Sequence, residues 1–226
     1  ALVLLGPALV YLGRLDHAER VFATCAATCE QAGDLLHLGV TLVNRTALWS
    51  KRADPARHAE DARRAIALGR ELGNLQLERA AAFDLAEHLH RAGASEQALP
   101  LVQRSAELAR RMNNDRPPPD DAVLLARVLA ALGEASAAAA QLAWAHQHAA
   151  PMAPALAVMA RLAALMLSPP ASDAPWAELV ADATTADKLD ERHEVLVMAL
   201  AAARQRQDAI SAERWHAELE VACQAT

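Results

Sequence analysis

Two pairs of residues have the types and the spacing that metal or redox chemistry needs. Cys25 and Cys29 are four residues apart, so on a helix their thiols would lie one turn apart. Asp84 and His88 have the same spacing, which suits two metal ligands on one helix face, but the sequence around them offers no third ligand. We therefore predict no metal site and no cofactor, and we expect Cys25 to pack as a small buried residue.

Motifs for enzyme catalysis are missing from the sequence. No glycine-rich phosphate loop follows a strand, and no Gly-x-Ser-x-Gly or comparable nucleophile motif occurs. Glu87 and Arg91 are spaced four residues apart, which indicates an ion pair on a helix rather than a metal ligand. We predict that the chain is not an enzyme.

The composition favours helices and argues against several classes of partner. Alanine and leucine dominate, whereas phenylalanine and tyrosine together number three, which is typical of closely packed helices. A net charge of −6 without any run rich in Lys or Arg argues against binding to nucleic acid. Three cysteines without a C-x-x-C pair do not make a disulfide framework, so we expect a reducing, cytoplasmic location.

The chain begins with thirteen nearly uncharged residues, ALVLLGPALVYLG. No Lys or Arg precedes Arg14, which argues against a signal peptide. A membrane span needs roughly 20 apolar residues, so this run is too short and we predict no membrane association. We interpret it as the first helix of a repeat within a fragment of a larger protein, and its exposed apolar edge allows self-association through this helix.

A period of forty residues organises the first 150 residues. Each period contains two helical patterns and two short breaks. The first breaks are at Gly13, Ala53, Gly93 and Gly133. The second breaks, where a left-handed residue would end a helix, are at Gly33, Gly73 and Asn113. The repeating unit is therefore a pair of helices.

The period drifts after residue 150, but helical patterns resume. We predict helices over residues 176–186, 190–205 and 209–223, which brings the total to twelve. The predicted fold class is all-α, with about six antiparallel helix pairs in a single domain over residues 1–226. Residues 1–150 hold the regular repeats and residues 151–226 the divergent ones.

The pattern LGxxLxxLGxxxxAxxxFxxC, which spans Leu5 to Cys25, resembles the tetratricopeptide repeat. The resemblance implies a right-handed α-solenoid in which large residues of the first helix of each pair receive small and aromatic residues of the second. The period of forty is longer than the usual 34 residues of that family. Longer repeats of this kind are similar to those in the tails of bacterial ATPase-type regulators and of TPR-bearing Ser/Thr kinases.

In the resembled family the first helices line a concave face that binds peptides. The resemblance therefore implies a protein or peptide partner, within a signalling or regulatory protein, and these contact residues: Asn44, Lys51, Phe83, Asp84, Glu87, His90, Arg91 and Arg127. For any one of them, the alternative is that it only solvates the groove. An alternative function is a sensory domain that encloses a small molecule or a signalling peptide.

Arg45 occupies a position that holds leucine in the sister repeats, namely Leu5, Leu85 and Leu125. A guanidinium at a packing position needs a partner, because burying an unpaired charge is very costly. We predict an ion pair between Arg45 and an acid of the next first helix, with Glu78 as the named partner and Asp84 or Glu87 as alternatives. Extension of the side chain into solvent, or a local shift of register, would also explain it.

Overall fold

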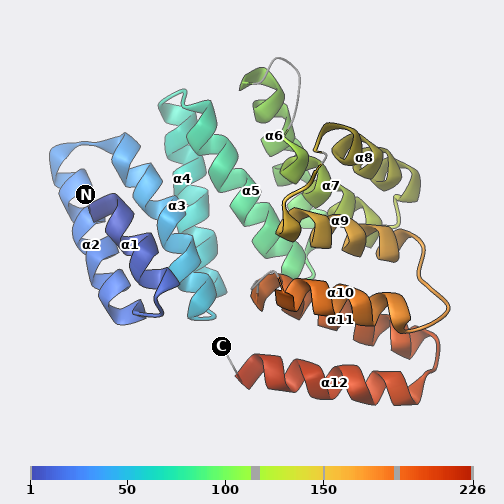
Figure 1. Ribbon diagram of the computed structural model, residues 1–226. Helices are drawn as coiled ribbons and strands as arrows, with labels where there is room; N and C mark the ends of the chain where they lie inside the picture. The colour runs from blue at the N-terminus through green and yellow to red at the C-terminus, as the bar shows by residue number, and fades with distance from the viewer. Residues whose placement is uncertain (1, 113–117, 150, 186–188, 225–226) are drawn as a thin grey trace. The chain divides into compact units, whose positions relative to one another are not determined.

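The structure is a computed structural model that describes residues 2–112, 118–149, 151–185 and 189–224. Within these ranges it contains twelve α-helices and no strand (Figure 1). The helices are α1 (Leu2–Tyr11), α2 (Leu15–Ala32), α3 (Leu35–Lys51), α4 (Pro55–Glu71), α5 (Leu75–Arg91), α6 (Ser95–Met112), α7 (Pro119–Ala131), α8 (Ala135–His148), α9 (Pro154–Leu167), α10 (Ala174–Thr185), α11 (Leu189–Gln205) and α12 (Ala209–Gln224). The predicted all-α class is confirmed, and so are the last three predicted helices, to within two residues at every end that the structure describes.

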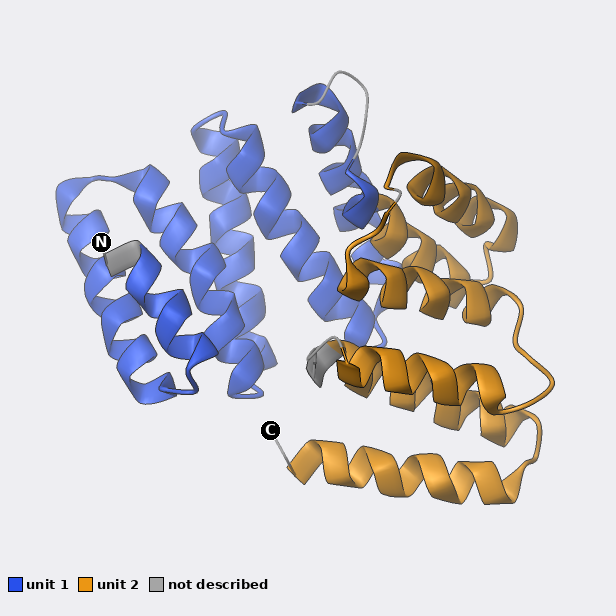
Figure 2. Ribbon diagram, viewed as in Figure 1, with its two compact units in different colours: residues 1–121 blue, residues 122–226 orange. Residues whose placement is uncertain are grey.

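The chain divides into two compact units, residues 1–121 and residues 122–226 (Figure 2). In unit 1, helices α1 to α6 form three successive hairpins, and α3 packs on both α1 and α5. Helices that occupy the same place in successive repeats therefore lie side by side in unit 1. In unit 2, α9 likewise packs on α11, and each helix from α8 to α11 contacts the next one along the chain.

Each unit has its own apolar core. In unit 1 one cluster joins α1, α2 and α3 around Phe22 and Trp49, and a second joins α2 to α5 around Leu42 and Ala81. Unit 2 has a larger cluster that contains two buried tryptophans. In the part of the chain that the structure describes, no helix is both long enough and apolar enough to cross a membrane.

The breaks between helices follow the predicted spacing. The first breaks all have a positive φ: +70° at Gly13, +50° at Ala53, +79° at Gly93 and +80° at Gly133. The second breaks at Gly33 and Gly73 have φ values of +66° and +62°. Asn113, the third of this set, lies outside the described residues. Among the described breaks, a left-handed residue therefore recurs at intervals of forty residues.

Side-chain caps fix the starts of three consecutive helices in unit 1. Asp34 accepts a hydrogen bond from the backbone N–H of His37 at 3.1 Å, Asp54 accepts one from Arg57 at 3.0 Å, and Asn74 one from Leu77 at 2.9 Å. These bonds satisfy backbone donors that have no partner inside the helix. The same backbone bond from His37 lowers the pKa of Asp34.

Ala53 is the residue at which the repeat departs from glycine, and it adopts a left-handed conformation that L side chains disfavour. We expect Ala53→Gly to raise the free energy of unfolding by about 0.5 to 1 kcal/mol, because it removes this strain at a cost of only a little chain entropy. Urea denaturation followed by circular dichroism measures the change. Ala92→Gly is the control: Ala92 directly follows α5 and has a φ of −76°, so glycine there should not stabilise the protein. Equal effects of both changes would contradict the strain at Ala53.

Candidate partner-binding site

The first helices of unit 1 carry a row of partly exposed side chains on one face. On α3 this row consists of Leu36, Val40, Val43 and Ala47, which are spaced three or four residues apart. On α5 the residues forty positions later continue it: Gln76, Ala80, Phe83 and Glu87. Tyr11 of α1 is 88 % exposed. We name these nine residues the first-helix face. The residues in its middle are apolar, and the helices that carry it pack on one another in the order α1, α3, α5.

Six of the eight predicted contact residues lie on or beside this face. Asn44 is half-buried and Lys51 is exposed at the end of α3. Phe83 and Asp84 are half-buried in the middle of α5. Glu87 and Arg91 form the ion pair that their spacing predicts, with a distance of 3.2 Å between Oε1 and Nη2.

The other two predicted contact residues are buried. His90 accepts or donates a hydrogen bond between its Nδ1 and the Oγ of Ser95 at 3.0 Å. Arg127 lies in unit 2, is 2 % exposed and forms an ion pair with Glu194 of α11. Its guanidinium is therefore held inside unit 2 rather than on an exposed face.

The two candidate redox residues lie in an apolar core of unit 1. Cys25 and Cys29 are both buried free cysteines, and the Sγ of Cys25 lies 3.2 Å from the Oγ1 of Thr41. Burial, followed by the proximity of Cys25, raises the pKa of the Cys29 thiol, which disfavours the thiolate that metal binding requires. Among the described residues, no three His, Cys, Asp or Glu side chains are placed to hold a metal ion.

Polar side chains from α3, α4 and α5 form a cluster around the buried His58. Its Nδ1 lies 3.1 Å from the Oγ of Ser50, and its Nε2 lies 3.0 Å from the Oδ2 of Asp84, without the alignment of a hydrogen bond. The ring of His58 stacks on that of His88 with 3.9 Å between centroids. Burial, followed by the neighbouring His58, lowers the pKa of His88 even though Asp84 opposes the shift.

Because His88 lies in this stack, we expect the folded chain to lose stability in mild acid. Because the pKa of His88 is lower in the folded chain than its usual value of about 6.5, the unfolded chain binds the proton more readily. The free energy of unfolding should therefore fall as the pH drops below about 6.5. We expect His88→Phe, which keeps an aromatic ring over His58, to flatten this dependence. His37→Gln, which changes an exposed histidine, should not. Urea denaturation at a series of pH values measures it, and an unchanged slope in His88→Phe would contradict the prediction.

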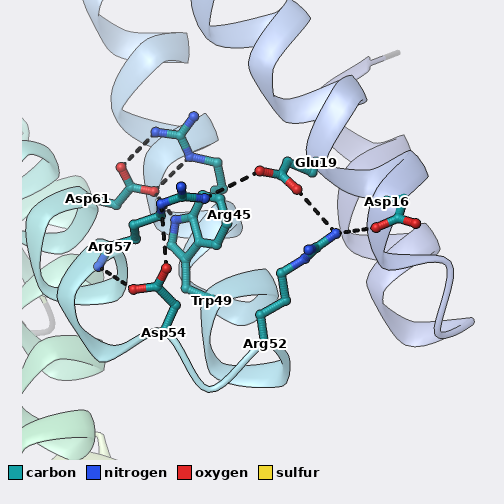
Figure 3. Close-up of polar contacts among 8 residues, drawn as sticks. All are labelled: Asp16, Glu19, Arg45, Trp49, Arg52, Asp54, Arg57 and Asp61. Carbon is teal, nitrogen blue, oxygen red and sulfur yellow. Dashed lines mark hydrogen bonds and ion pairs between the residues drawn. The ribbon is translucent and has the colours of Figure 1, made fainter.

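Arg45 reaches into the gap between α2 and α4, where it meets Asp61 (Figure 3). Both contacts are 2.7 Å long: Nε donates to Oδ2 and Nη2 donates to Oδ1 of the same carboxylate. Trp49 also donates from Nε1 to Asp61 Oδ2 at 2.6 Å. A carboxylate that is only 7 % exposed thus accepts bonds from a cation and from an indole.

The predicted Arg45–Glu78 pair is wrong in its partner. Arg45 does bind a carboxylate, but the acid comes from α4, the second helix of the same hairpin, instead of from α5. Glu78 is occupied by two other cations, Arg70 of α4 at 2.9 Å and Arg104 of α6 at 3.0 Å. Burial raises the pKa of Glu78, but the bonds from Arg104 and Arg70 outweigh it, and the net effect is a lowered pKa.

Exposed ion pairs surround the Arg45–Asp61 contact and connect the first two hairpins (Figure 3). Arg52 pairs with Asp16 and Glu19 of α2, and Arg57 lies 3.4 Å from Glu19. The guanidinium of Arg57 also covers the ring of Trp49, 4.9 Å from its centroid. A groove of about 310 Å³ lies beside these contacts, and its lining residues are Glu19, Ala23, Arg45, Trp49, Arg57, Glu60, Asp61 and Arg64. We name it the charged groove.

No protein-family model matches the chain, and no curated protein matches it in sequence. The resemblance to tetratricopeptide repeats stays a prediction that rests on the residues quoted above. The function must likewise be argued from the site itself.

Sequence reasoning missed Asp61 as the partner of Arg45 and Trp49 as the second donor to Asp61. A signal was present: Asp61 falls where the next repeat has Leu101, just as Arg45 falls where that repeat has Leu85. A buried ion pair requires two charged residues at positions that are otherwise apolar. This repeat has both of them. Comparing the repeats position by position would have predicted the contact.

Proposed function

We propose that this chain is a non-catalytic scaffold whose first-helix face binds a peptide or a protein segment. The observation that carries the proposal is the row of partly exposed apolar side chains across α1, α3 and α5, with Tyr11 and Phe83 as its aromatic members. Soluble domains seldom leave contiguous apolar side chains exposed without a use, and aromatic side chains are common anchors in interfaces. Polar residues at its edge, Asn44, Lys51 and Arg91, suit a partner with backbone and carboxylate groups.

The proposal includes the arrangement that the repeat implies. The hairpins would continue as a right-handed, TPR-like solenoid of about six helix pairs, with the first-helix face on its concave side. By the same resemblance, the chain would be part of a larger bacterial signalling or regulatory protein in the cytoplasm. Self-association through the exposed apolar residues of α1, such as Leu4 and Tyr11, would compete with partner binding.

The test begins with a peptide library displayed on phage and selected against the immobilised full chain. Selected peptides are then synthesised, and their affinities are measured by calorimetry for the wild type and for Phe83→Ser. We expect the variant to weaken binding by about tenfold or more, since loss of an aromatic anchor typically costs 2 kcal/mol or more. Leu72→Ser, which changes an exposed leucine in the turn after α4, is the matched control and should bind as the wild type does.

The proposal fails if no peptide is selected, or if every selected peptide binds Phe83→Ser and the wild type equally.

A sensory function is the second candidate. The charged groove favours it, because its volume of about 310 Å³ is within the range of ligand pockets, at the lower end. In that case small zwitterionic compounds should raise the melting temperature of the wild type but not of Trp49→Leu. A peptide partner would leave such compounds without effect.

A further inference from the structure

A second groove lies one repeat after the charged groove and differs from it in chemistry. It lies between α4 and α6, with α5 as its floor, and has a volume of about 420 Å³. Its walls are largely apolar: Ile66, Ala67, Leu85, Leu89, Pro100 and Leu101. We name it the apolar groove.

The two grooves occupy equivalent places in successive repeats. Adding forty to Arg45, Trp49 and Asp61 gives Leu85, Leu89 and Leu101, which all line the apolar groove. Adding forty to Arg57, whose guanidinium covers Trp49, gives Gln97 in the same groove. The charged groove therefore contains an indole ring and an ion pair where the apolar groove has only leucines. The space that a tryptophan occupies in one repeat is held by a smaller side chain in the next.

Two cations flank the apolar groove, and no carboxylate lines it. Arg63 is exposed and has no carboxylate partner among the described residues. Arg70 is 59 % exposed and shares the single carboxylate of Glu78 with Arg104. Its guanidinium can therefore also donate hydrogen bonds to a carboxylate of a bound partner. The two arginines are seven residues apart on α4, which places them about 10 Å apart along the same helix face.

We propose that the apolar groove is a second docking site, for a peptide segment in which one large apolar side chain, tryptophan above all, is flanked by acidic residues. The apolar side chain would fill the space above Leu85 and Leu89, as Trp49 fills its place in the sister repeat. The acidic residues would pair with Arg63 and Arg70, whose spacing matches about three residues of extended chain. This site lies between second helices and is independent of the first-helix face.

The test uses the full chain and a short fluorescein-labelled peptide that carries one tryptophan between two pairs of glutamates. We expect saturable binding in a fluorescence-anisotropy titration, which weakens as salt is added because the contacts with Arg63 and Arg70 are exposed. A peptide with lysines in place of the glutamates, and one with alanine in place of the tryptophan, should each bind at least about tenfold more weakly. Equal binding of the lysine peptide, or no saturation below millimolar concentration, overturns the proposal.

Matched variants locate the site. Ala67→Phe should block the groove, because Ala67 is an exposed residue of its wall, whereas Ala27→Phe changes the equivalent exposed residue one repeat earlier and should bind as the wild type does. Arg63→Glu should weaken binding, whereas Arg20→Glu, the same reversal on α2, should not. Both blocking positions are exposed, and an unchanged circular dichroism melt verifies that the variants fold. Equal effects of Ala67→Phe and Ala27→Phe overturn the proposal.

Two further measurements separate this site from the alternatives. Phe83→Ser should leave binding of the acidic peptide unchanged, so failure of the first-helix face and failure of the apolar groove give different results. Binding of indole propionate without binding of the peptide would make the groove a small-molecule site and would overturn the proposed peptide partner.

Discussion

Arg45→Leu is expected to lower the free energy of unfolding by about 3 to 5 kcal/mol, the usual cost of leaving one half of a buried ion pair without its partner. The carboxylate of Asp61 is 7 % exposed, so water can replace only a small part of the two hydrogen bonds that Arg45 donates. The bond from Trp49 would remain, but an indole supplies no positive charge. Asp61→Leu alone should also destabilise the chain, since it leaves both Arg45 and Trp49 without their acceptor.

The next repeat has leucines in place of this ion pair, and it therefore indicates which substitutions should restore the free energy of unfolding. Leu85 and Leu101 stand where Arg45 and Asp61 stand, and both contribute to the apolar walls of the next groove. We therefore expect the double change Arg45→Leu with Asp61→Leu to recover most of the stability lost in either single variant. The indole N–H of Trp49 would still lack its acceptor in this double variant, so the recovery should be incomplete.

Urea denaturation of the wild type, the two single variants and the double variant gives the coupling energy of the pair, and hydrogen exchange locates the loss to α3 and α4. Arg57→Leu is the control, because its side chain is 56 % exposed and exposed ion pairs contribute less than about 1 kcal/mol. A double variant as unstable as the sum of the single ones would show that the contact is not a coupled pair.

Gly69→Ala is expected to lower the free energy of unfolding by about 1 to 3 kcal/mol, as overpacking of a well-packed contact does. A Cβ on Gly69 of α4 would lie 2.6 Å from the backbone nitrogen of Glu78 and 2.8 Å from its Cα. Backbone atoms cannot rotate away, so α4 and α5 would have to separate. That separation would also disturb Glu78, which joins α4, α5 and α6 through Arg70 and Arg104.

Gly39→Ala is the matched control, because Gly39 is also a buried glycine inside a helix. A Cβ there would meet the far end of the Leu77 side chain at 2.5 Å, and a flexible side chain can adopt another rotamer. Alanine also favours helix over glycine by about 1 kcal/mol, which offsets the repacking. We expect thermal unfolding to separate the two variants clearly, and equal losses would argue against the close approach of α4 and α5.

The fold was largely predictable because its main signal is local. Glycine at Gly13, Gly33, Gly73, Gly93 and Gly133 marks places where the backbone must become left-handed, and no other residue type does so at as little cost. Ala53 was predictable only through the period, since alanine by itself gives no such signal. Apolar spacing between these breaks then identified the helices.

The partners of polar side chains were harder to predict. Helical spacing predicts which residues share a helix face, but it does not predict which of two neighbouring helices a long side chain contacts. Arg45 could reach α4 or α5, and the choice depends on how far the helices are apart, which the sequence does not encode locally. Arg127 was misjudged for a related reason: its partner Glu194 is 67 residues away, beyond the range of any repeat pattern.

In unit 1, the helices that pack together are next to each other in the chain or separated by one helix. As the polypeptide leaves the ribosome, each new hairpin therefore meets its packing partners after about one period of synthesis, without waiting for distant segments. Contacts this local favour rapid folding and keep apolar surfaces uncovered only briefly. Unit 1 can thus be completed hairpin by hairpin during translation.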